Sequence, residues 1–345
     1  MPGVTAAASP LQALRERRYQ IAPQMKDYDL LGQKRWLPYV MFFQPPGLKT
    51  RSFTTDEQGF RRTLDRGNSV SYSEFNRSSR PRAILLGASA AFGVGASSDR
   101  STLASLLNDG SERLWFNYSG RAFNSTQELI LFLLYLQEPV ESVLLFSGVN
   151  HLVLSHLAQE TSPVYNSFFF QSLFERGMNA DLAVRRGGLR RLLKGEFLRP
   201  PAEGPAPTPS SDSERYENAL ACFRRDMRIW GLLREAMGFQ IRFVFQPVLP
   251  WVGKELSGQE RELFDLVDKI FPEESANGFM EFLMGKKDRF VADVESICRS
   301  QKIPFLDLNT RPSFTRPDWL FVDRIHLTDE GYALARQEIR KEFAL

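Results

Sequence analysis

The stretch ILLGASAAFGVGAS, from Ile84 to Ser97, decides the fold of this chain. Its first apolar residues have the length and composition of a strand that is buried on both faces of a sheet. Small residues follow at once and keep the chain thin where the strand ends. The first hydroxyl after the strand belongs to Ser89. This order predicts a serine at the carboxyl edge of the sheet, which is where open α/β sheets bind their ligands.

Four more apolar runs have the length of buried strands, and helix-like stretches separate them. The predicted strands are Ala83–Leu86, Leu114–Tyr118, Ser142–Ser147, Gln240–Phe245 and Ile303–Leu308. The predicted helices are Thr102–Asn108, Ser125–Gln137, Arg215–Met237, Gln259–Ile270, Phe279–Ser300 and Thr328–Phe343. Strands that alternate with helices form a parallel sheet with helices on both faces. We therefore expect an α/β domain with a five-stranded parallel sheet.

Capping signals mark the ends of three of these helices. Asn124 or Ser125 is placed to cap the second predicted helix, with Glu128 at the capping-box position. Gly238 is a C′ glycine signal at the end of the third. Thr328 is the predicted N-cap of the last helix. These signals fix helix ends that periodicity alone leaves open.

Two regions do not fit the alternation of strands and helices. Residues 1–80 are too apolar for a disordered tail, so we expect an N-terminal extension that packs on a core domain of residues 81–345. Residues 151–212 form an insertion after the third strand, a lid candidate whose end, 199–213, is predicted to be a flexible loop. Within it, residues 184–199 are strongly basic, which fits a solvated helix face or contact with an acidic partner or a membrane surface.

Composition excludes several classes of protein. Of 345 residues, 43% are hydrophobic and 25% charged, as in ordinary globular proteins. The net charge of +3 comes with no basic stripe interleaved with stacking aromatics, so nucleic acid is not an expected partner. Two cysteines and three scattered histidines give no disulfide framework and no metal-ligand spacing, and we expect no metal and no cofactor. Without a signal peptide or a long apolar span, the predicted location is cytoplasmic.

Polar side chains gather where the predicted strands end. Ser89 follows the first strand, and Asn150 and His151 follow the third. After the fifth, Asp323 precedes His326 by three residues. A hydroxyl, a carboxamide, backbone amides and an Asp/His pair at one sheet edge are the parts needed for acyl transfer through a serine.

These segments resemble the blocks of the SGNH (GDSL-like) hydrolase superfamily of esterases, lipases, deacetylases and acyltransferases. LLGASAAFGVGAS resembles the first block, with Gly87-Ala88-Ser89 where Gly-Asp-Ser is usual. SGVNHL resembles Gly-x-Asn-Asp, with His151 in place of the Asp, and DRIHLTDEGY resembles Asp-x-x-His. The resemblance covers residue 84 to about residue 340, interrupted by the insertion. It implies a flavodoxin-like three-layer α/β/α domain.

The resemblance also implies roles. Ser89 is the nucleophile, His326 the base, and Asp323 the group that orients the imidazole. The N–H of Ser89 and the Asn150 side chain bind the oxyanion.

A second backbone N–H for the oxyanion comes from Ala122 or Gly120. Alignment with the family's second block, counted back from Asn124-Ser125, favours Ala122. Arg121 beside this loop fits a substrate anion or a helix-end salt bridge. His151 is a candidate substrate contact or a structural histidine.

The implied function is a serine-dependent esterase, deacylase or O-acyltransferase that acts on short acyl esters such as acetyl. A small-molecule or glycan ester of bacterial surface polysaccharide metabolism is the expected substrate by analogy alone. The alternative is a catalytically inactive relative that binds a glycan or a partner, since Ala88, Ala122 and His151 depart from the family pattern.

Overall fold

The structure is a computed structural model that describes residues 9–29, 35–137, 139–157, 161–164, 211–271 and 279–345. The basic segment 184–199 lies outside these residues, as do most of the insertion 151–212 and of the predicted loop 199–213. None of the described helices is long and apolar enough to cross a membrane.

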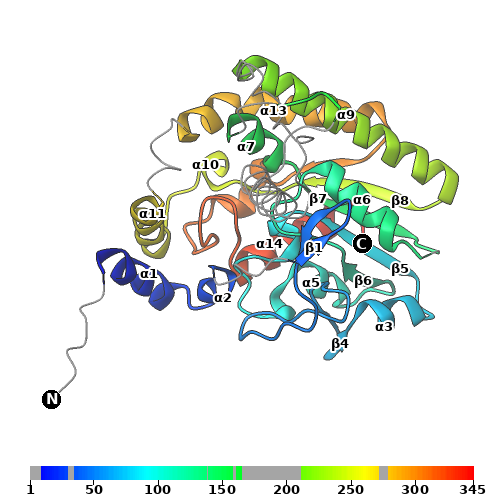
Figure 1. The fold of residues 1–345 in the computed structure, drawn as a ribbon, viewed down its shortest axis with the longest axis horizontal. Coiled ribbons are helices and arrows are strands. Elements are labelled where there is room, and N and C mark those ends of the chain that lie inside the picture. Colours follow the sequence, from blue (N-terminus) through cyan, green and yellow to red (C-terminus); the bar gives the residue numbers. More distant parts are fainter. Residues whose placement is uncertain (1–8, 30–34, 138, 158–160, 165–210, 272–278) are drawn as a thin grey trace, which may run out of the picture.

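The centre of the molecule is a five-stranded parallel sheet in the order β6-β5-β7-β8-β9 (Figure 1). Its strands are β5 (Arg82–Gly87), β6 (Leu114–Asn117), β7 (Ser142–Ser147), β8 (Gln240–Phe245) and β9 (Phe305–Asp307). All neighbouring pairs are parallel. Counted from β5, this is the order 2-1-3-4-5 of flavodoxin-like sheets. The predicted fold class is therefore confirmed.

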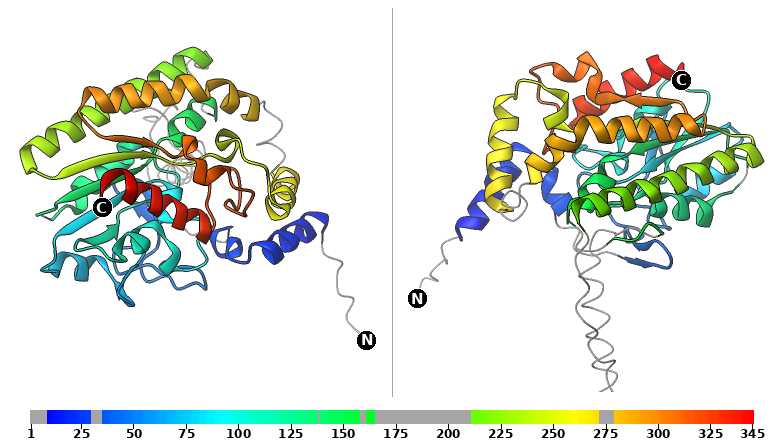
Figure 2. Two further views of the ribbon diagram at one scale, coloured as in Figure 1. Left: turned by 180° about the vertical axis from the view of Figure 1, so that it is seen from behind. Right: turned by 90° about the horizontal axis from the view of Figure 1, so that it is seen from above.

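Helices cover both faces of this sheet (Figure 2). One face packs on α6 (Ser125–Tyr135), α7 (Val149–Leu157), α9 (Asp212–Met237) and α13 (Phe279–Ser300). The other packs on α4 (Ser89–Phe92), α5 (Leu103–Asn108), α10 (Leu249–Val252) and α14 (Asp329–Phe343), and α11 (Gly258–Ile270) lies beyond the sheet edge. Three short 3₁₀ turns are Asp99–Ser101, Leu308–Thr310 and Pro312–Thr315. Successive residues of β5 alternate between the two cores, as a strand buried on both faces must.

The caps explain where the helices begin and end. Asn124 caps α6, and its capping-box partner is Gln127. The expectation that Glu128 fills that position is wrong, because Glu128 is buried and accepts a hydrogen bond from the Ser147 hydroxyl instead. Gly238 ends α9 with a φ of +75°, and Thr328 caps α14.

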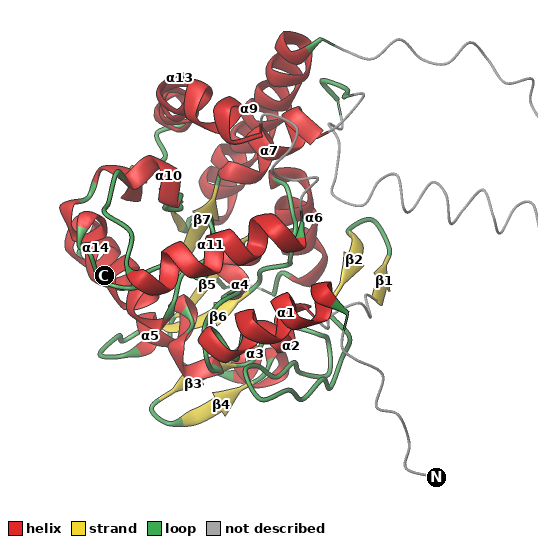
Figure 3. Ribbon diagram, turned by 90° about the vertical axis from the view of Figure 1, so that its left-hand side faces the viewer, coloured by secondary structure: helices red, strands yellow, loops and turns green. Residues whose placement is uncertain are grey.

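The first eighty residues contribute their own small elements. They are α1 (Pro10–Ile21), α2 (Met25–Asp29), β1 (Arg35–Leu37), β2 (Met41–Phe43), β3 (Thr63–Asp65), β4 (Asn68–Val70) and α3 (Tyr72–Arg77). Strands β1 and β2 form one antiparallel hairpin, and β3 and β4 form another. Helix α1 packs against α11 (Figure 3). Phe42 and Phe43 of the first hairpin contact the ring of Phe123, in the loop between β6 and α6.

A fully buried arginine, Arg61, joins this N-terminal part to the sheet domain. Its guanidinium pairs with Asp99 at 2.8 Å and donates to the carbonyl oxygens of Phe92, Gly93 and Ser52. A buried charge is tolerated only when it is paired and hydrogen-bonded, and Arg61 meets both conditions.

Candidate active site

Ser89 lies at the carboxyl edge of the sheet, as the opening sequence predicts. Strand β5 ends at Gly87, where φ is +155° and a Cβ atom would lie 2.1 Å from the Phe146 carbonyl oxygen. Only glycine fits there, so the chain turns sharply into α4, whose first residue is Ser89. The turn ends at Gly93, which has a φ of +95°. Ser89 is partly exposed.

Ser89, His326 and Asp323 form one hydrogen-bonded line. The Ser89 hydroxyl lies 2.8 Å from His326 Nε2, and His326 Nδ1 lies 2.7 Å from Asp323 Oδ2. The other carboxylate oxygen, Oδ1, accepts the backbone N–H groups of Ile325 and His326, each at 2.9 Å. Because these two bonds fix the carboxylate, Oδ2 stays aimed at the imidazole.

The electrostatics of Asp323 set the tautomer of the histidine. Burial alone would raise the pKa of Asp323, but the charge and hydrogen bond of His326 and the N–H of Ile325 lower it to about 2. The carboxylate is therefore ionised at neutral pH and accepts a hydrogen bond from the Nδ1–H group. Nε2 is left as an acceptor for the Ser89 hydroxyl, which is the arrangement of a serine nucleophile with its base.

The loop from residue 119 to residue 124 connects β6 to α6 beside Ser89. Ala122 adopts a φ of +60°, in the left-handed region that alanine rarely occupies. Among the described residues, no acceptor is recorded for the Ala122 N–H. The Gly120 N–H donates to the Gly87 carbonyl oxygen at 3.2 Å. A Cβ at Gly120 would lie 2.0 Å from the Phe123 ring, so this glycine is needed for packing.

Asn150 and His151 both bind the end of this loop from α7. Asn150 Nδ2 donates to the Phe123 carbonyl oxygen at 2.7 Å, and Asn150 lies within the first turn of α7, not at its N-cap. His151 is 1% exposed, and its Nε2 accepts the Ser125 N–H at 3.1 Å. Burial, together with the charge of Arg225, lowers the pKa of His151 to about 4, so the ring is neutral. The structure thus places His151 beneath the loop, where it supports the backbone.

Arg121, the other candidate substrate contact, binds the backbone of α2. Its Nη1 donates to the Tyr28 carbonyl oxygen of α2 at 3.0 Å. Burial lowers the pKa of its guanidinium, while Asp29 and Tyr28 oppose that change. Within the described part of the chain, no carboxylate lies within ion-pair distance of Arg121.

The sequence did not indicate that α1 and α2 contribute to the surroundings of the site. Arg18 of α1 pairs with Asp29 of α2, and its charge helps to lower the pKa of Asp323. The Tyr28 hydroxyl lies within hydrogen-bond distance of the carbonyl oxygens of Gly93 (2.9 Å) and Ala96 (2.7 Å), and Gly93 ends the short helix that begins at Ser89. No motif marks these residues, because they reach the site from a segment remote in sequence.

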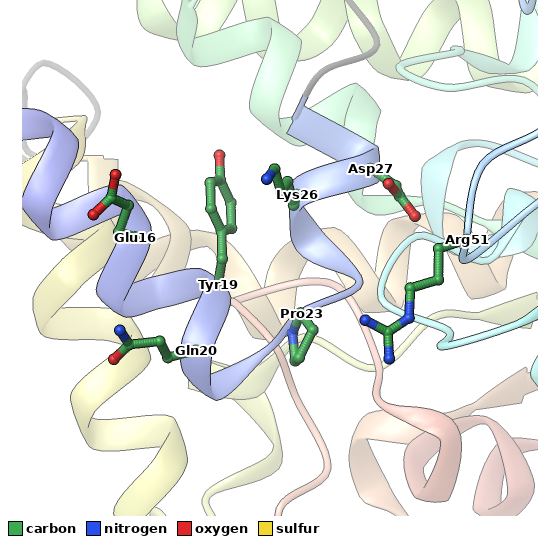
Figure 4. Close-up of a pocket in the computed structure, with 7 residues that line it drawn as sticks. All are labelled: Glu16, Tyr19, Gln20, Pro23, Lys26, Asp27 and Arg51. Atoms are coloured by element: carbon green, nitrogen blue, oxygen red, sulfur yellow. The ribbon is translucent and has the colours of Figure 1, made fainter.

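A separate hollow of about 560 Å³ lies along α1 and α2 and reaches Arg51 (Figure 4). Its lining residues are Glu16, Tyr19, Gln20, Pro23, Lys26, Asp27 and Arg51. Ser89, Asp323 and His326 do not line it. No group of three or more His, Cys, Asp or Glu side chains that could hold a metal ion is found among the residues with described positions.

Comparisons with known proteins give remote structural similarity only. No protein-family model matches the chain, and no curated protein matches its sequence. An acetyl xylan esterase, AlAXEase, is 9% identical over 76% of this chain and 99% of its own, with a TM-score of 0.41. An extracellular lipase from Streptomyces rimosus is 13% identical over 75% of this chain and 99% of its own (TM-score 0.40). The salicylyl-acyltransferase SsfX3 of a tetracycline biosynthetic pathway is 13% identical over 78% of this chain and 55% of its own (TM-score 0.37).

Proposed function

We propose that this protein is a serine-dependent esterase or O-acyltransferase of the SGNH type. The observation that carries the proposal is the hydrogen-bonded line from Ser89 through His326 to Asp323. It lies at the carboxyl edge of a sheet with flavodoxin-like strand order. No other arrangement of described side chains in the molecule joins a hydroxyl, an imidazole and a carboxylate in this way.

The reaction follows from this geometry. Ser89 Oγ attacks the acyl carbon and gives its proton to His326 Nε2, while Asp323 stabilises the imidazolium that forms. The tetrahedral intermediate collapses, and His326 returns the proton to the departing alcohol oxygen. Water or an acceptor hydroxyl then attacks the acyl-serine, with His326 again as base. Water gives the free acid, and an acceptor gives a new ester.

The oxyanion is bound by three donors in this proposal. They are the N–H of Ser89, the N–H of Ala122 and the second N–H of the Asn150 amide, whose first N–H is bound to Phe123. We favour Ala122 over Gly120 because the Gly120 N–H already donates to Gly87. Each such donor contributes about 3–4 kcal/mol of transition-state stabilisation in well-studied hydrolases.

The substrate in this proposal is a short acyl ester, such as acetyl, on a carbohydrate or another sugar-containing molecule. The support for a sugar is the resemblance of the sequence blocks, which is analogy. The cytoplasmic location and the division at residue 80 stay predictions.

Hydrolysis of p-nitrophenyl acetate tests the activity. We expect Ser89→Ala to abolish turnover and Ser98→Ala, a matched loss of a hydroxyl in the same loop region, to retain it. Labelling with a fluorophosphonate tests the inactive-binder alternative, since labelling of folded wild-type protein at Ser89 excludes it. Turnover that persists in Ser89→Ala would refute Ser89 as the nucleophile. Product analysis with a sugar acceptor separates transfer from hydrolysis.

A further inference from the structure

Two arginines beside the candidate active site share a single carboxylate neighbour. Arg18 has a side chain that is 4% exposed, and it pairs with Asp29. The Arg18 Nε is buried and has no partner among the described residues. Arg121 also acts on Asp29 electrostatically, from beyond ion-pair distance. Among the described residues, Asp29 is thus the only carboxylate within ion-pair distance of either guanidinium group.

This cluster is connected to the candidate site by sequence and by charge. Arg121 directly precedes Ala122, the residue proposed to supply the oxyanion N–H. Arg18 lies near enough to Asp323 for its charge to help lower the pKa of that carboxyl. In turn, the charge of Asp323 helps to raise the pKa of Asp29. The cluster therefore lies within electrostatic range of the triad and next to the oxyanion loop.

Burial makes an unused N–H donor of a guanidinium group costly unless an acceptor pairs with it. Desolvation is the main cause that lowers the pKa of Arg121, and it is also the main cause that raises the pKa of Asp29. Arg121 uses one recorded hydrogen bond, to the Tyr28 carbonyl, although a guanidinium carries five N–H donors. The planar fork of arginine matches a carboxylate or a phosphate.

We propose that Arg18 and Arg121 form a subsite for an oxyanionic group of the substrate, a carboxylate or a phosphate, close to the ester that Ser89 attacks. This inference rests on the proposed function and narrows its substrate class to acyl esters of anionic sugars or similar anionic molecules. Asp29 holds Arg18 in place, and the Tyr19 hydroxyl donates to Asp29 at 3.1 Å. Tyr19 also lines the hollow of α1 and α2 (Figure 4).

The first test compares two aryl acetates that differ in charge and by one methyl group. The probes are 4-acetoxybenzoate, which is anionic, and methyl 4-acetoxybenzoate, which is neutral. We expect Arg121→Gln and Arg18→Gln each to lower the ratio of their kcat/KM values by about tenfold, the size of one lost charged hydrogen bond. Arg15→Gln removes the same charge from an exposed position of α1 and should leave the ratio unchanged. An unchanged ratio in both subsite variants would overturn the proposal.

The second test measures anion binding without turnover. Inorganic phosphate and benzoate are titrated separately into full-length Ser89→Ala protein at constant ionic strength, which shows whether phosphate or carboxylate is preferred. We expect the dissociation constant of the preferred anion to rise at least tenfold on adding Arg121→Gln and to stay constant on adding Arg15→Gln. Arg121→Lys and Arg18→Lys serve if a glutamine variant does not fold, and they should weaken binding because the planar fork is lost.

The two proposals fail in different ways. If neither anion binds Ser89→Ala protein, or if both bind Arg121 variants as tightly as the parent, the subsite is wrong, whatever the esterase activity. If an anion binds and the arginine variants weaken it while wild-type protein cleaves no ester and reacts with no fluorophosphonate, the subsite stands and the proposed function fails.

Discussion

Replacement of Asp323 by asparagine tests the catalytic line most directly. The carboxylate accepts three N–H groups: Oδ1 accepts those of Ile325 and His326 at 2.9 Å, and Oδ2 accepts that of the imidazole at 2.7 Å. In Asp323→Asn, the amide oxygen can keep both backbone bonds. The amide nitrogen then faces His326 Nδ1 and donates to it.

This reversal places the imidazole proton on the wrong nitrogen. With Nδ1 as an acceptor, the proton of neutral His326 moves to Nε2, which faces the Ser89 hydroxyl at 2.8 Å. The histidine cannot then accept the serine proton. In a serine protease the same change lowers kcat by about 10⁴-fold, which is about 5.5 kcal/mol of activation free energy. We expect a fall of that order here, with the fold retained because both backbone bonds survive.

The assay is p-nitrophenyl acetate hydrolysis at pH 7.5 together with a thermal melt of each variant. Asp329→Asn is the matched control. Asp329 is the first residue of α14 and accepts hydrogen bonds from Ser97, and none of its recorded bonds in the described structure goes to Ser89, Asp323 or His326. We expect the control to retain activity. If well-folded Asp323→Asn kept more than a tenth of the wild-type kcat, the assigned role of Asp323 would be refuted.

Three further predictions test the oxyanion loop and a buried carboxyl. Asn150→Ala should lower kcat about 100- to 1000-fold. A rise in KM with unchanged kcat would contradict a role of Asn150 in the transition state. Ala122→Gly should raise the free energy of unfolding by up to about 1 kcal/mol in urea melts. The reason is that relief of about 1–2 kcal/mol of left-handed backbone strain exceeds the entropy cost of glycine. A lower free energy of unfolding would show that Ala122 is not strained. Burial raises the pKa of Glu128 from 4.5 to about 8, so between these pH values the folded protein holds a proton that the unfolded chain loses. The free energy of unfolding should therefore fall as the pH rises from 4.5 to 8, by up to about 1.4 kcal/mol per pH unit. Glu128→Gln should remove this slope between pH 5 and pH 8, and a slope that persists would show that other groups cause it.

The central strands were predictable because β5, β6 and β7 are buried along their whole length and β8 along most of its length. A parallel strand between two helical layers has to be apolar along its whole length, which makes Ser142–Ser147 and Gln240–Phe245 visible in sequence with their observed ends. The last strand is shorter than predicted and covers Phe305–Asp307, because apolar residues beside it pack without pairing. The positions of Ser89 and His326 after predicted strands indicated that both lie at one edge of the sheet, because the carboxyl ends of parallel strands share that edge.

The surroundings of the site were less visible in the sequence. His151 departs from the family pattern, and periodicity cannot show that its ring supports the Ser125 N–H from below. Arg18 and Asp29 belong to short helices whose contacts are long-range, so no local signal connects them to Asp323. Side chains that act through tertiary contacts leave no spacing rule in the sequence. Only the folded chain brings them together.

The contacts of Arg61 limit how far the chain can be shortened from its N-terminal end. Its guanidinium holds the carbonyl oxygens of Phe92 and Gly93, which end the short helix that begins at Ser89. A fragment that starts at residue 81 keeps all five central strands together with Ser89, Asp323 and His326. It leaves those carbonyl groups and Asp99 without the guanidinium of Arg61. We therefore expect a fragment with an ordered Ser89 to need residues that precede the first central strand, Arg61 among them.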